Sequence, residues 1–225
     1  MSTDDRRGHS DTIYDVVVVG GGVVGCAVAR LLSHHDLSIA LLEAGPDLGA
    51  GTSKANTAIL HTGFDSTPGS IEARLVARGY ALLREYAPSV GISVEEVGAL
   101  LVAWDDEQAA ALAKIDAKAK TNGYHHTQIV DRATVYENEP HLGPGATGGM
   151  IVPDEHIIDP WSTPLAFAYE ALANGAHVAV NRDVAACEPG TDVTAITSTD
   201  GQRIRCRFVV NAAGLRGDDL HRSLG

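Results

Sequence analysis

Three glycines and one glutamate have the types and spacing needed to hold a dinucleotide. Gly20, Gly22 and Gly25 form a GxGxxG motif, and Glu43 follows 23 residues after the first glycine. In such a motif the first glycine permits a tight turn, the second lets the backbone approach a pyrophosphate, and the third lets helix and strand pack closely. An acidic side chain at the position of Glu43 accepts hydrogen bonds from ribose hydroxyls and repels a 2′-phosphate, which disfavours NADP.

The residues around this motif predict the elements that such a site requires. Residues 14–19 end in a β-branched run typical of a strand buried on both faces, and residues 26–33 have helical composition. Residues 38–43 form a second apolar run. The strand, turn, helix and strand together span about thirty residues, the size of a crossover unit. This context favours a dinucleotide site over its alternative, a plain glycine-rich turn with a solvated glutamate.

The order of the later segments distinguishes two kinds of dinucleotide fold. A simple NAD-binding domain continues with alternating strands and helices. Here residues 44–66 instead form a long loop of the kind that is usually functional, and a helix follows from 68 to about 86. After an inserted segment the apolar strands resume with one expected at 177–180. A three-strand meander is expected at 183–187, 192–197 and 202–207, and a last strand at 208–211. This order favours FAD over NAD.

The composition excludes several classes of protein. A chain of 225 residues with 44% hydrophobic residues suits one globular domain, or one and a half, with a buried core. The net charge of −12 disfavours a nucleic-acid partner and docking on anionic lipid. No stretch reaches the ~20 apolar residues of a membrane span. Cys26, Cys187 and Cys206 share no spacing motif, which together with the lack of a signal peptide indicates reduced thiols in a cytoplasmic protein. Residues 1–12 are polar and are expected to be a disordered tail.

Four segments carry a resemblance to a known family. In chain order they are VVVVGGGVVGCAVARLL, LLEAG, GTSKANTAILHTGFDSTPGSIEARL and VVNAAGLRGDDL. Together they resemble the FAD-dependent oxidoreductases of the D-amino-acid-oxidase superfamily. Within it, residues 51–75 resemble FAD-dependent glycerol-3-phosphate dehydrogenases, and L-2-hydroxyglutarate dehydrogenases carry a similar pattern. The resemblance covers about residues 13–225 of this chain, which correspond to the N-terminal half of the family's chain.

The resemblance implies an α/β fold with a Rossmann-like FAD-binding domain, built from a parallel sheet and a β-meander. Part of an α+β substrate domain is inserted into it. The FAD-binding domain is expected at residues 13–90 and 155–225, and the partial substrate domain at 91–154. Because the C-terminal half of the family fold is absent, we expect a fragment, a truncated gene product or one piece of a split enzyme.

The resemblance also implies FAD as the cofactor and a set of residues that hold it. Gly20, Gly22 and Gly25 would hold the pyrophosphate, and Glu43 the adenosine ribose. The remaining implied contacts come from small residues or backbone, which can approach a cofactor closely. Gly51, Thr52 and Ser53 would lie at the phosphates and ribityl chain. The backbone of Val184 would reach the adenine, and Ala213 and Gly214 would make a second close approach to the FAD.

His61 is the residue that the resemblance places beside the flavin ring. Oxidation of an alcohol to a ketone needs a base for the hydroxyl proton, and an imidazole near neutrality suits that task. The alternative is a histidine that only hydrogen-bonds the flavin or the loop backbone. Lys54 and Arg74 are the basic residues nearest to the cofactor loop, and neither stands out as the group that binds an anionic substrate.

The function implied is FAD-dependent oxidation of a small anionic hydroxy compound, with glycerol-3-phosphate first and L-2-hydroxyglutarate second. The alternatives are a non-catalytic flavin-binding remnant and an amine or amino-acid oxidase, which the match over residues 51–70 disfavours. Electrons would pass to a quinone or to a partner subunit, which leaves open a peripheral association with the inner face of the membrane. Neither a metal site nor a nucleic-acid partner is predicted.

Overall fold

The computed structural model describes residues 12–224, and backbone contacts divide them into two compact units. One unit comprises residues 12–56 and 160–224, and the other comprises Thr57–Asp159. All but the last residue of the tail expected at 1–12 lies outside the described residues. The division also differs from the boundaries expected at 90/91 and 154/155. The assignment of one part to the cofactor and the other to the substrate stays a prediction.

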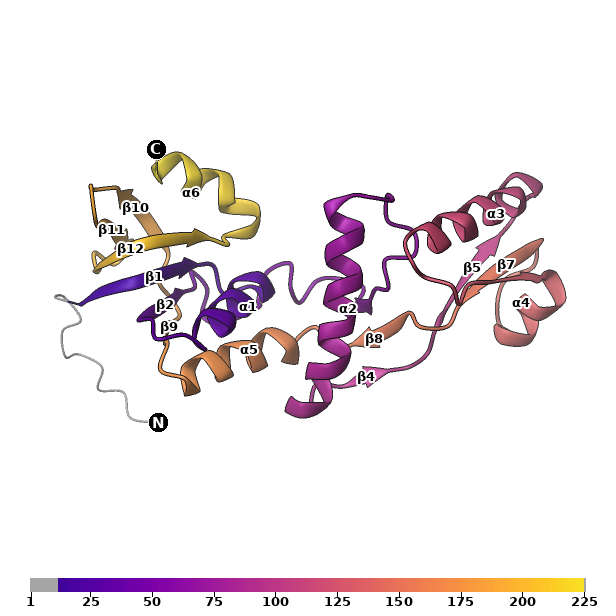
Figure 1. Ribbon diagram of the computed structural model, residues 1–225, viewed down its shortest axis with the longest axis horizontal. Coiled ribbons are helices and arrows are strands. Elements are labelled where there is room, and N and C mark those ends of the chain that lie inside the picture. The colour runs from indigo at the N-terminus through magenta and orange to yellow at the C-terminus, as the bar shows by residue number, and fades with distance from the viewer. Residues whose placement is uncertain (1–11, 225) are drawn as a thin grey trace. The chain divides into compact units, whose positions relative to one another are not determined.

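The first unit is built on a six-stranded sheet (Figure 1). A parallel group in the order β12-β1-β2-β9 continues through β12 into the antiparallel meander β10-β11-β12. The strands are β1 (Ile13–Val19), β2 (Ile39–Leu42), β9 (His177–Ala179), β10 (Val184–Glu188), β11 (Thr194–Ser198) and β12 (Arg203–Asn211).

Strand β1 lies in the middle of this sheet, as its β-branched run predicts. Val17 and Val18 are completely buried, and β2 is buried along its whole length. Helices α1 (Val23–Leu32) and α5 (Ser162–Ala173) pack side by side, and the Nε atom of Arg30 donates to Glu170 Oε2 at 2.7 Å between them. A 3₁₀ turn, η1 (Gly214–Arg216), and helix α6 (Gly217–Leu224) follow β12.

Strand β12 corrects one expectation. The sequence predicts two strands, at 202–207 and 208–211, whereas the structure has a single strand from Arg203 to Asn211. Cys206 explains the continuity, because it is paired with Thr194 of β11 on one side and with Tyr14 of β1 on the other. The chain therefore passes from the meander into the parallel sheet without a break.

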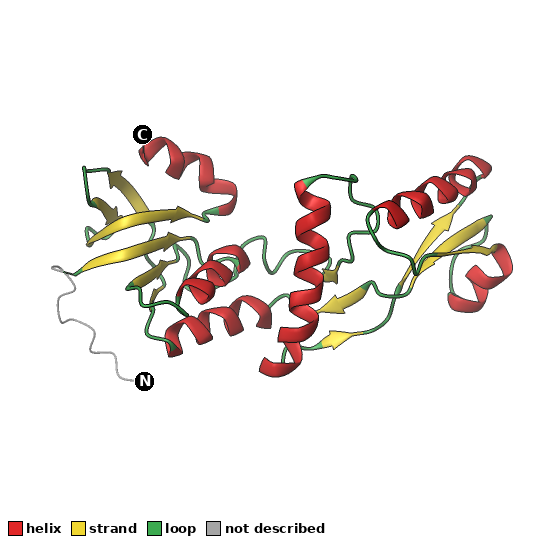
Figure 2. Cartoon of the chain, viewed as in Figure 1, coloured by secondary structure: helices red, strands yellow, loops and turns green. Residues whose placement is uncertain are grey.

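The second unit contains two small antiparallel sheets and three helices (Figure 2). Its buried core includes Phe64, Leu112, Met150 and Val152. The sheets have the orders β3-β8-β4 and β5-β7-β6. The elements are β3 (Ile59–Leu60), α2 (Ile71–Val90), β4 (Val94–Glu95), β5 (Ala99–Ala103), α3 (Asp106–Thr121), β6 (Gln128–Asp131), α4 (Arg132–Asn138), β7 (Gly148–Val152) and β8 (His156–Ile158).

Each helix of this unit is preceded by a short polar residue whose side chain caps its N-terminus. Ser70, Asp105 and Asp131 each accept a backbone N–H from the first turn of α2, α3 and α4. Helix α2 continues past the expected end near Tyr86 to Val90, where Gly91 closes it in a left-handed conformation.

A single asparagine ties the residues around 61–66 to the rest of the second unit. The Nδ2 atom of Asn122, at the end of α3, donates to the carbonyl oxygens of Gly63, Phe64 and Ser66 at 3.1, 3.3 and 2.8 Å. A long polar loop offers no periodic signal for such a contact, so the sequence placed this segment with the cofactor domain.

Candidate functional site

The glycine turn after β1 has two structural glycines. Gly20 has a φ of +111°, and a Cβ on it would lie 2.2 Å from the carbonyl oxygen of Ala212. A Cβ on Gly25 would lie 1.8 Å from the carbonyl oxygen of Gly20. Both glycines are therefore required by the packing of β1, α1 and β12 against one another.

Gly22 differs from its two neighbours in the motif. Its backbone is extended, and a Cβ on it would meet only Ser53 Oγ, at 3.2 Å. Gly22 is the N-cap of α1 and provides no side-chain cap, and the N–H of Val23 donates to Ser53 Oγ at 2.9 Å. The N-terminus of α1 thus presents the positive end of the helix dipole at a turn with little side-chain cover, a combination that favours an anion.

Glu43 is fixed by two backbone groups at the end of β2. Its Oε2 accepts the N–H of Gly21 at 2.7 Å, and its Oε1 accepts the N–H of Gly45 at 2.7 Å. Each carboxylate oxygen has two lone pairs, so each still has one to offer a hydroxyl donor. The side chain is half-buried and oriented before any ligand binds.

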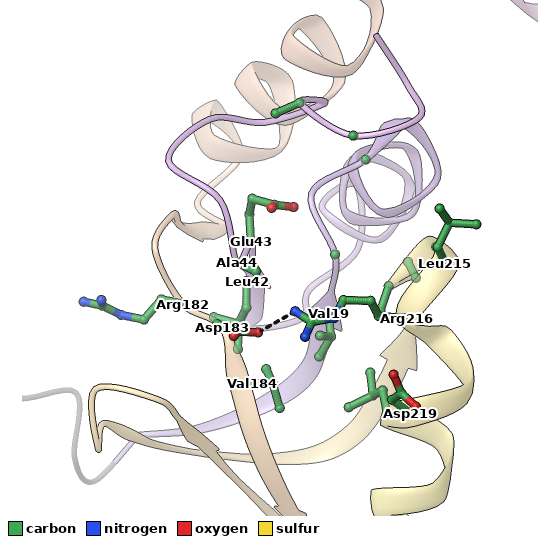
Figure 3. Close-up of a pocket in the computed structure, with 18 of the residues that line it drawn as sticks. Val19, Leu42, Glu43, Ala44, Arg182, Asp183, Val184, Leu215, Arg216 and Asp219 are labelled. Carbon is green, nitrogen blue, oxygen red and sulfur yellow. Dashed lines mark ion pairs between the residues drawn. The ribbon is translucent and has the colours of Figure 1, made fainter. Parts of the chain in front are cut away.

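A cavity of about 680 Å³ brings these elements together (Figure 3). That volume is within the range of small-molecule sites in proteins. Every cofactor residue implied by the sequence lines it except Gly25, which packs beneath the turn. The predicted residues along the cavity are Gly20, Gly22, Glu43, Gly51, Thr52, Ser53, Val184, Ala213 and Gly214.

Sequence reasoning missed the charged residues of this cavity. Arg182, Asp183, Arg216 and Asp219 also line it. Arg216 Nη1 lies 3.6 Å from Asp183 Oδ1, whereas Arg182 donates to Asp200 at 3.0 Å. The charged run RGDD after the NAAG turn was the available signal, since it follows directly on predicted cofactor residues.

Cys26 lies beneath the turn as a fully buried thiol. Its Sγ donates to the carbonyl oxygen of Gly21 at 3.3 Å, and burial raises the pKa of the thiol to about 12. The thiol therefore stays protonated near neutral pH and supports the turn. Cys187 and Cys206 are likewise free and buried.

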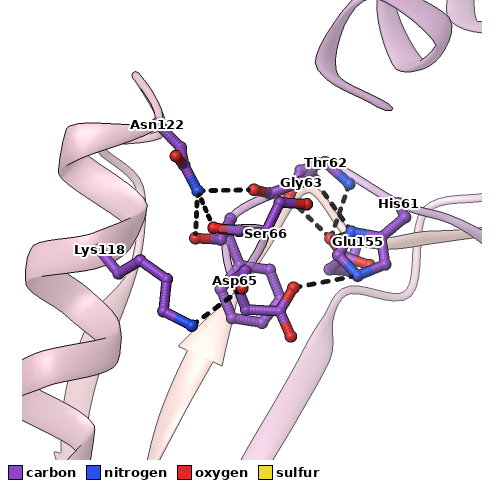
Figure 4. Close-up of polar contacts among 9 residues, drawn as sticks. His61, Thr62, Gly63, Asp65, Ser66, Lys118, Asn122 and Glu155 are labelled. Carbon is purple, nitrogen blue, oxygen red and sulfur yellow. Dashed lines mark hydrogen bonds and ion pairs between the residues drawn. The ribbon is translucent and has the colours of Figure 1, made fainter. Parts of the chain in front are cut away.

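His61 follows β3 in the second unit and is held by four neighbours (Figure 4). Its Nδ1 accepts the N–H of Gly63 at 2.9 Å, and its ring stacks on Phe64 with centroids 5.7 Å apart. Glu155 Oε1 lies 3.3 Å from Nδ1, and Asp65 Oδ1 lies 3.4 Å from Nε2.

Glu155 is the buried carboxylate of this cluster, with 4% of its surface exposed. Its Oε1 accepts both the N–H and the Oγ1–H of Thr62, at 2.7 and 2.6 Å. These two donors compensate for the burial of the charge and link the turn before β8 to the segment that carries His61.

The hydrogen bond from Gly63 determines where a neutral His61 carries its proton. Since Nδ1 accepts that N–H, the imidazole hydrogen is on Nε2. For Nε2 to act as a base, the hydrogen must be on Nδ1 instead, where Glu155 is the carboxylate near enough to accept it. The role of His61 beside a flavin stays a prediction.

Lys54 and Arg74 are the basic residues that the sequence analysis considered as binding groups for an anionic substrate. Lys54 pairs with Asp47 at 2.6 Å, and its Nζ lies 5.5 Å from the ring centre of Trp161. Arg74 lines a second cavity of about 370 Å³ at the start of α2, together with Ser70 and Asn122.

A family model described as "FAD dependent oxidoreductase" (DAO) matches residues 15–225 of this chain. The chain belongs to the DAO family of FAD-dependent oxidoreductases. The resemblance seen in the sequence and the α/β, Rossmann-like fold class are therefore confirmed. FAD is the cofactor of this oxidoreductase family, as the sequence indicated.

Two curated relatives of this DAO-family chain are dehydrogenases. Glycerol 3-phosphate dehydrogenase of Caloramator mitchellensis is 32% identical over 209 residues, which cover 93% of this chain and 43% of the relative. Mitochondrial L-2-hydroxyglutarate dehydrogenase of Homo sapiens is 33% identical over 229 residues, which cover 95% and 49%. The chain thus spans about half the length of the curated relatives it matches.

Solved structures of two oxidases share the fold. L-alpha-glycerophosphate oxidase from Mycoplasma pneumoniae, with FAD bound, matches with a TM-score of 0.90 at 25% identity, over 94% of this chain and 57% of that one. Glycine oxidase from Geobacillus kaustophilus matches with a TM-score of 0.81 at 25% identity, over 94% and 58%.

The cavity of this DAO-family chain has the features that FAD requires. A Cβ on Gly51 would meet no protein atom within 4 Å, so packing does not demand this glycine, and its backbone is open to a ligand. The start of α1, where the N-cap Gly22 has no side chain, suits a pyrophosphate, and the fixed carboxylate of Glu43 suits ribose hydroxyls. The residues present therefore fit the cofactor of the family.

Proposed function

We propose that this chain forms the FAD-binding part of a dehydrogenase that oxidises a small anionic hydroxy compound, with glycerol-3-phosphate as the first candidate. The observation that carries the proposal is the cavity, which gathers the glycine turn, Glu43, Gly51–Ser53, Val184 and Ala213–Gly214 around one space. The glycerol-3-phosphate and glycerophosphate relatives support the substrate class. L-2-hydroxyglutarate is the second candidate, supported by the human relative.

In this proposal the protein binds FAD mainly through backbone and small side chains. The N-terminus of α1 and the turn at Gly20–Gly22 hold the pyrophosphate, and Glu43 accepts hydrogen bonds from the adenosine ribose. The hydroxyls of Thr52 and Ser53 reach the phosphates and the ribityl chain. When bound, the flavin supplies a hydride acceptor.

His61 is the proposed base for the hydroxyl proton of the substrate. An imidazole is suited to this at neutral pH. The structure adds a condition. Nε2 of His61 can accept a proton only when the ring hydrogen is on Nδ1, whereas the hydrogen bond from Gly63 places it on Nε2. Glu155 Oε1 lies 3.3 Å from Nδ1 but already accepts two hydrogens from Thr62, so it favours that form by exchanging one of them for the Nδ1 hydrogen.

The proposed electron acceptor is a quinone or a partner subunit, in the cytoplasm or at the inner face of the membrane. Among the described residues, no helix combines the length and apolar character needed to cross a bilayer. Reduction of a soluble quinone analogue by the substrate-loaded protein tests the acceptor.

The test of the proposal starts from the absorbance spectrum of the purified chain after incubation with FAD and removal of free cofactor. We expect close to one flavin per chain. Anaerobic addition of glycerol-3-phosphate should then bleach the flavin absorbance, and L-2-hydroxyglutarate is added in a parallel sample. Glycine, an amino-acid substrate, is the control. A chain without flavin contradicts the proposal as a whole.

The other outcomes separate its parts. Bleaching by L-2-hydroxyglutarate alone selects the second candidate, and bleaching by glycine contradicts the substrate class. Bound flavin that none of the three compounds reduces identifies a flavin-binding chain without this activity, which was the alternative left open by the sequence.

A further inference from the structure

The cavity that we assign to FAD is crossed by an ion pair between its two walls. Arg216, in η1, places its Nη1 atom 3.6 Å from Oδ1 of Asp183, the residue before β10. Both residues line the cavity. Figure 3 shows the Arg216 side chain reaching toward Asp183, close to Val19. Val19 is the last residue of β1.

This ion pair is weak by its geometry. Its distance exceeds the 2.7–2.9 Å of a strong charged hydrogen bond, and the side chains of Arg216 and Asp183 are 72% and 42% exposed. Exposed pairs of this kind add little to stability. Breaking the pair therefore costs the folded chain little.

A second arginine of the same cavity is held differently. Arg182 Nη1 donates to Asp200 Oδ2 at 3.0 Å and to the carbonyl oxygen of Asn181 at 3.1 Å, and its side chain is 27% exposed. Arg216 is thus the more loosely held of the two, and its side chain is the one able to change partner.

The segment that carries Arg216 is joined to the glycine turn. The N–H of Ala212 donates to the carbonyl oxygen of Val19 at 2.8 Å, and the missing Cβ of Gly20 would lie against Ala212. The guanidinium therefore adds a full positive charge to the cavity that the turn before α1 also lines, where a dinucleotide pyrophosphate is expected.

We propose that Arg216 is a pyrophosphate-binding residue that Asp183 holds across the cavity until FAD enters. This inference rests on the proposed function. A pyrophosphate offers two negative charges and several acceptor oxygens, which the planar guanidinium can bind in a fork, whereas Asp183 offers one charge at long range. Entry of the cofactor exchanges the weak ion pair for the stronger one.

The test compares FAD affinity among four variants of the full chain, measured by quenching of flavin fluorescence. Arg216→Gln should raise the Kd about tenfold or more, because a charge-assisted contact is lost. Arg216→Lys should recover part of this loss, since the charge returns without the fork. Asp183→Asn should lower the Kd about threefold, because it frees Arg216 from an exposed pair. Arg203→Gln removes an equal charge from β12, where Arg203 pairs with Glu188 outside the cavity lining, and should leave the Kd unchanged.

Two further readings make the test decisive. Raising the salt concentration should weaken FAD binding less in Arg216→Gln than in the wild type. Salt screens the attraction between the Arg216 charge and the pyrophosphate, and the variant lacks this attraction. Circular dichroism confirms that each variant is folded. If Arg216→Gln binds FAD as tightly as the wild type and Arg203→Gln, the inference is overturned and the proposed function stands. If the wild-type chain binds no FAD, both are overturned.

Discussion

Glu43 accepts the backbone N–H of Gly21 at 2.7 Å, which fixes the end of β2 to the turn that follows β1. The second oxygen of the same carboxylate accepts the N–H of Gly45. A ligand hydroxyl would therefore meet an acceptor that is already oriented, so little ordering cost remains for binding. The residue serves the fold and the proposed ribose contact together.

Substitution of Glu43 should affect stability and cofactor affinity together. Glu43→Gln loses the charge and one of the two backbone contacts, so we expect the free energy of unfolding to fall by about 1–2 kcal/mol. The Kd for FAD should rise about tenfold, and more in Glu43→Arg. Chemical denaturation and flavin fluorescence measure the two effects. Glu188→Gln, on the exposed face of β10, is the control. Unchanged FAD affinity in both Glu43 variants would show that the ribose contact is wrong.

Gly22 and Gly25 should respond to substitution in opposite ways. Gly25→Ala places a Cβ 1.8 Å from the carbonyl oxygen of Gly20, so we expect several kcal/mol of destabilisation, of the order seen for overpacking. Gly22→Val has more room in the fold, and its side chain would occupy the approach of the pyrophosphate. The folded Gly22→Val chain should therefore lose FAD binding. Thermal melting and the flavin spectrum distinguish the two variants, and a yellow Gly22→Val protein of normal affinity would count against the pyrophosphate assignment.

His61→Ala should slow flavin reduction far more than it weakens FAD binding. Loss of a general base lowers the rate by ~10²–10⁴-fold, whereas loss of one hydrogen bond to a cofactor has a much smaller effect. Anaerobic stopped-flow reduction with whichever substrate is active gives the rate. A rate within a few-fold of the wild type would mean that His61 only supports the loop.

Glu155→Gln tests how the tautomer of His61 is controlled. The glutamine oxygen can still accept from Thr62, but it attracts an Nδ1 hydrogen less than a carboxylate does. The Nε2–H form that the Gly63 N–H favours should therefore lose its competitor, the Nδ1–H form, in the ¹⁵N NMR spectrum of His61. The reduction rate should be about tenfold lower, with FAD affinity unchanged. If the spectrum is the same as that of the wild type, Glu155 has no effect on the tautomer.

Cys26 should make the chain sensitive to alkaline pH. Its pKa is raised from 9.0 to about 12 in the folded chain, chiefly because burial disfavours the thiolate. The stability contribution is complete below the unfolded pKa near 9 and is lost as the pH rises through the folded value. The free energy of unfolding, followed from pH 8 to 11 by urea denaturation, should fall less steeply in Cys26→Ala than in the wild type. Equal slopes would show that other groups control the alkaline transition.

The sequence was sufficient for features whose partners lie close along the chain. The β-branched run before Gly20, the glycine spacing and the capping residues Ser70, Asp105 and Asp131 each specify a local conformation. A strand, a tight turn and a helix start depend on neighbours within a few residues, so their signals are visible without a fold. The family resemblance then extended these signals to the FAD-binding residues.

Only the tertiary structure decided which distant segments meet. Hydrophobic periodicity marks a strand without naming its neighbour, so the uninterrupted β12 and the pairing of β3 with β8 could not be predicted. The same holds for Glu155, which bonds Thr62 across 93 residues, and for Arg216, which meets Asp183 across the cavity. Charged side chains in loops carry no periodic pattern. Their partners are chosen by where the packed strands and helices bring the loops, and that choice exists only in the folded chain.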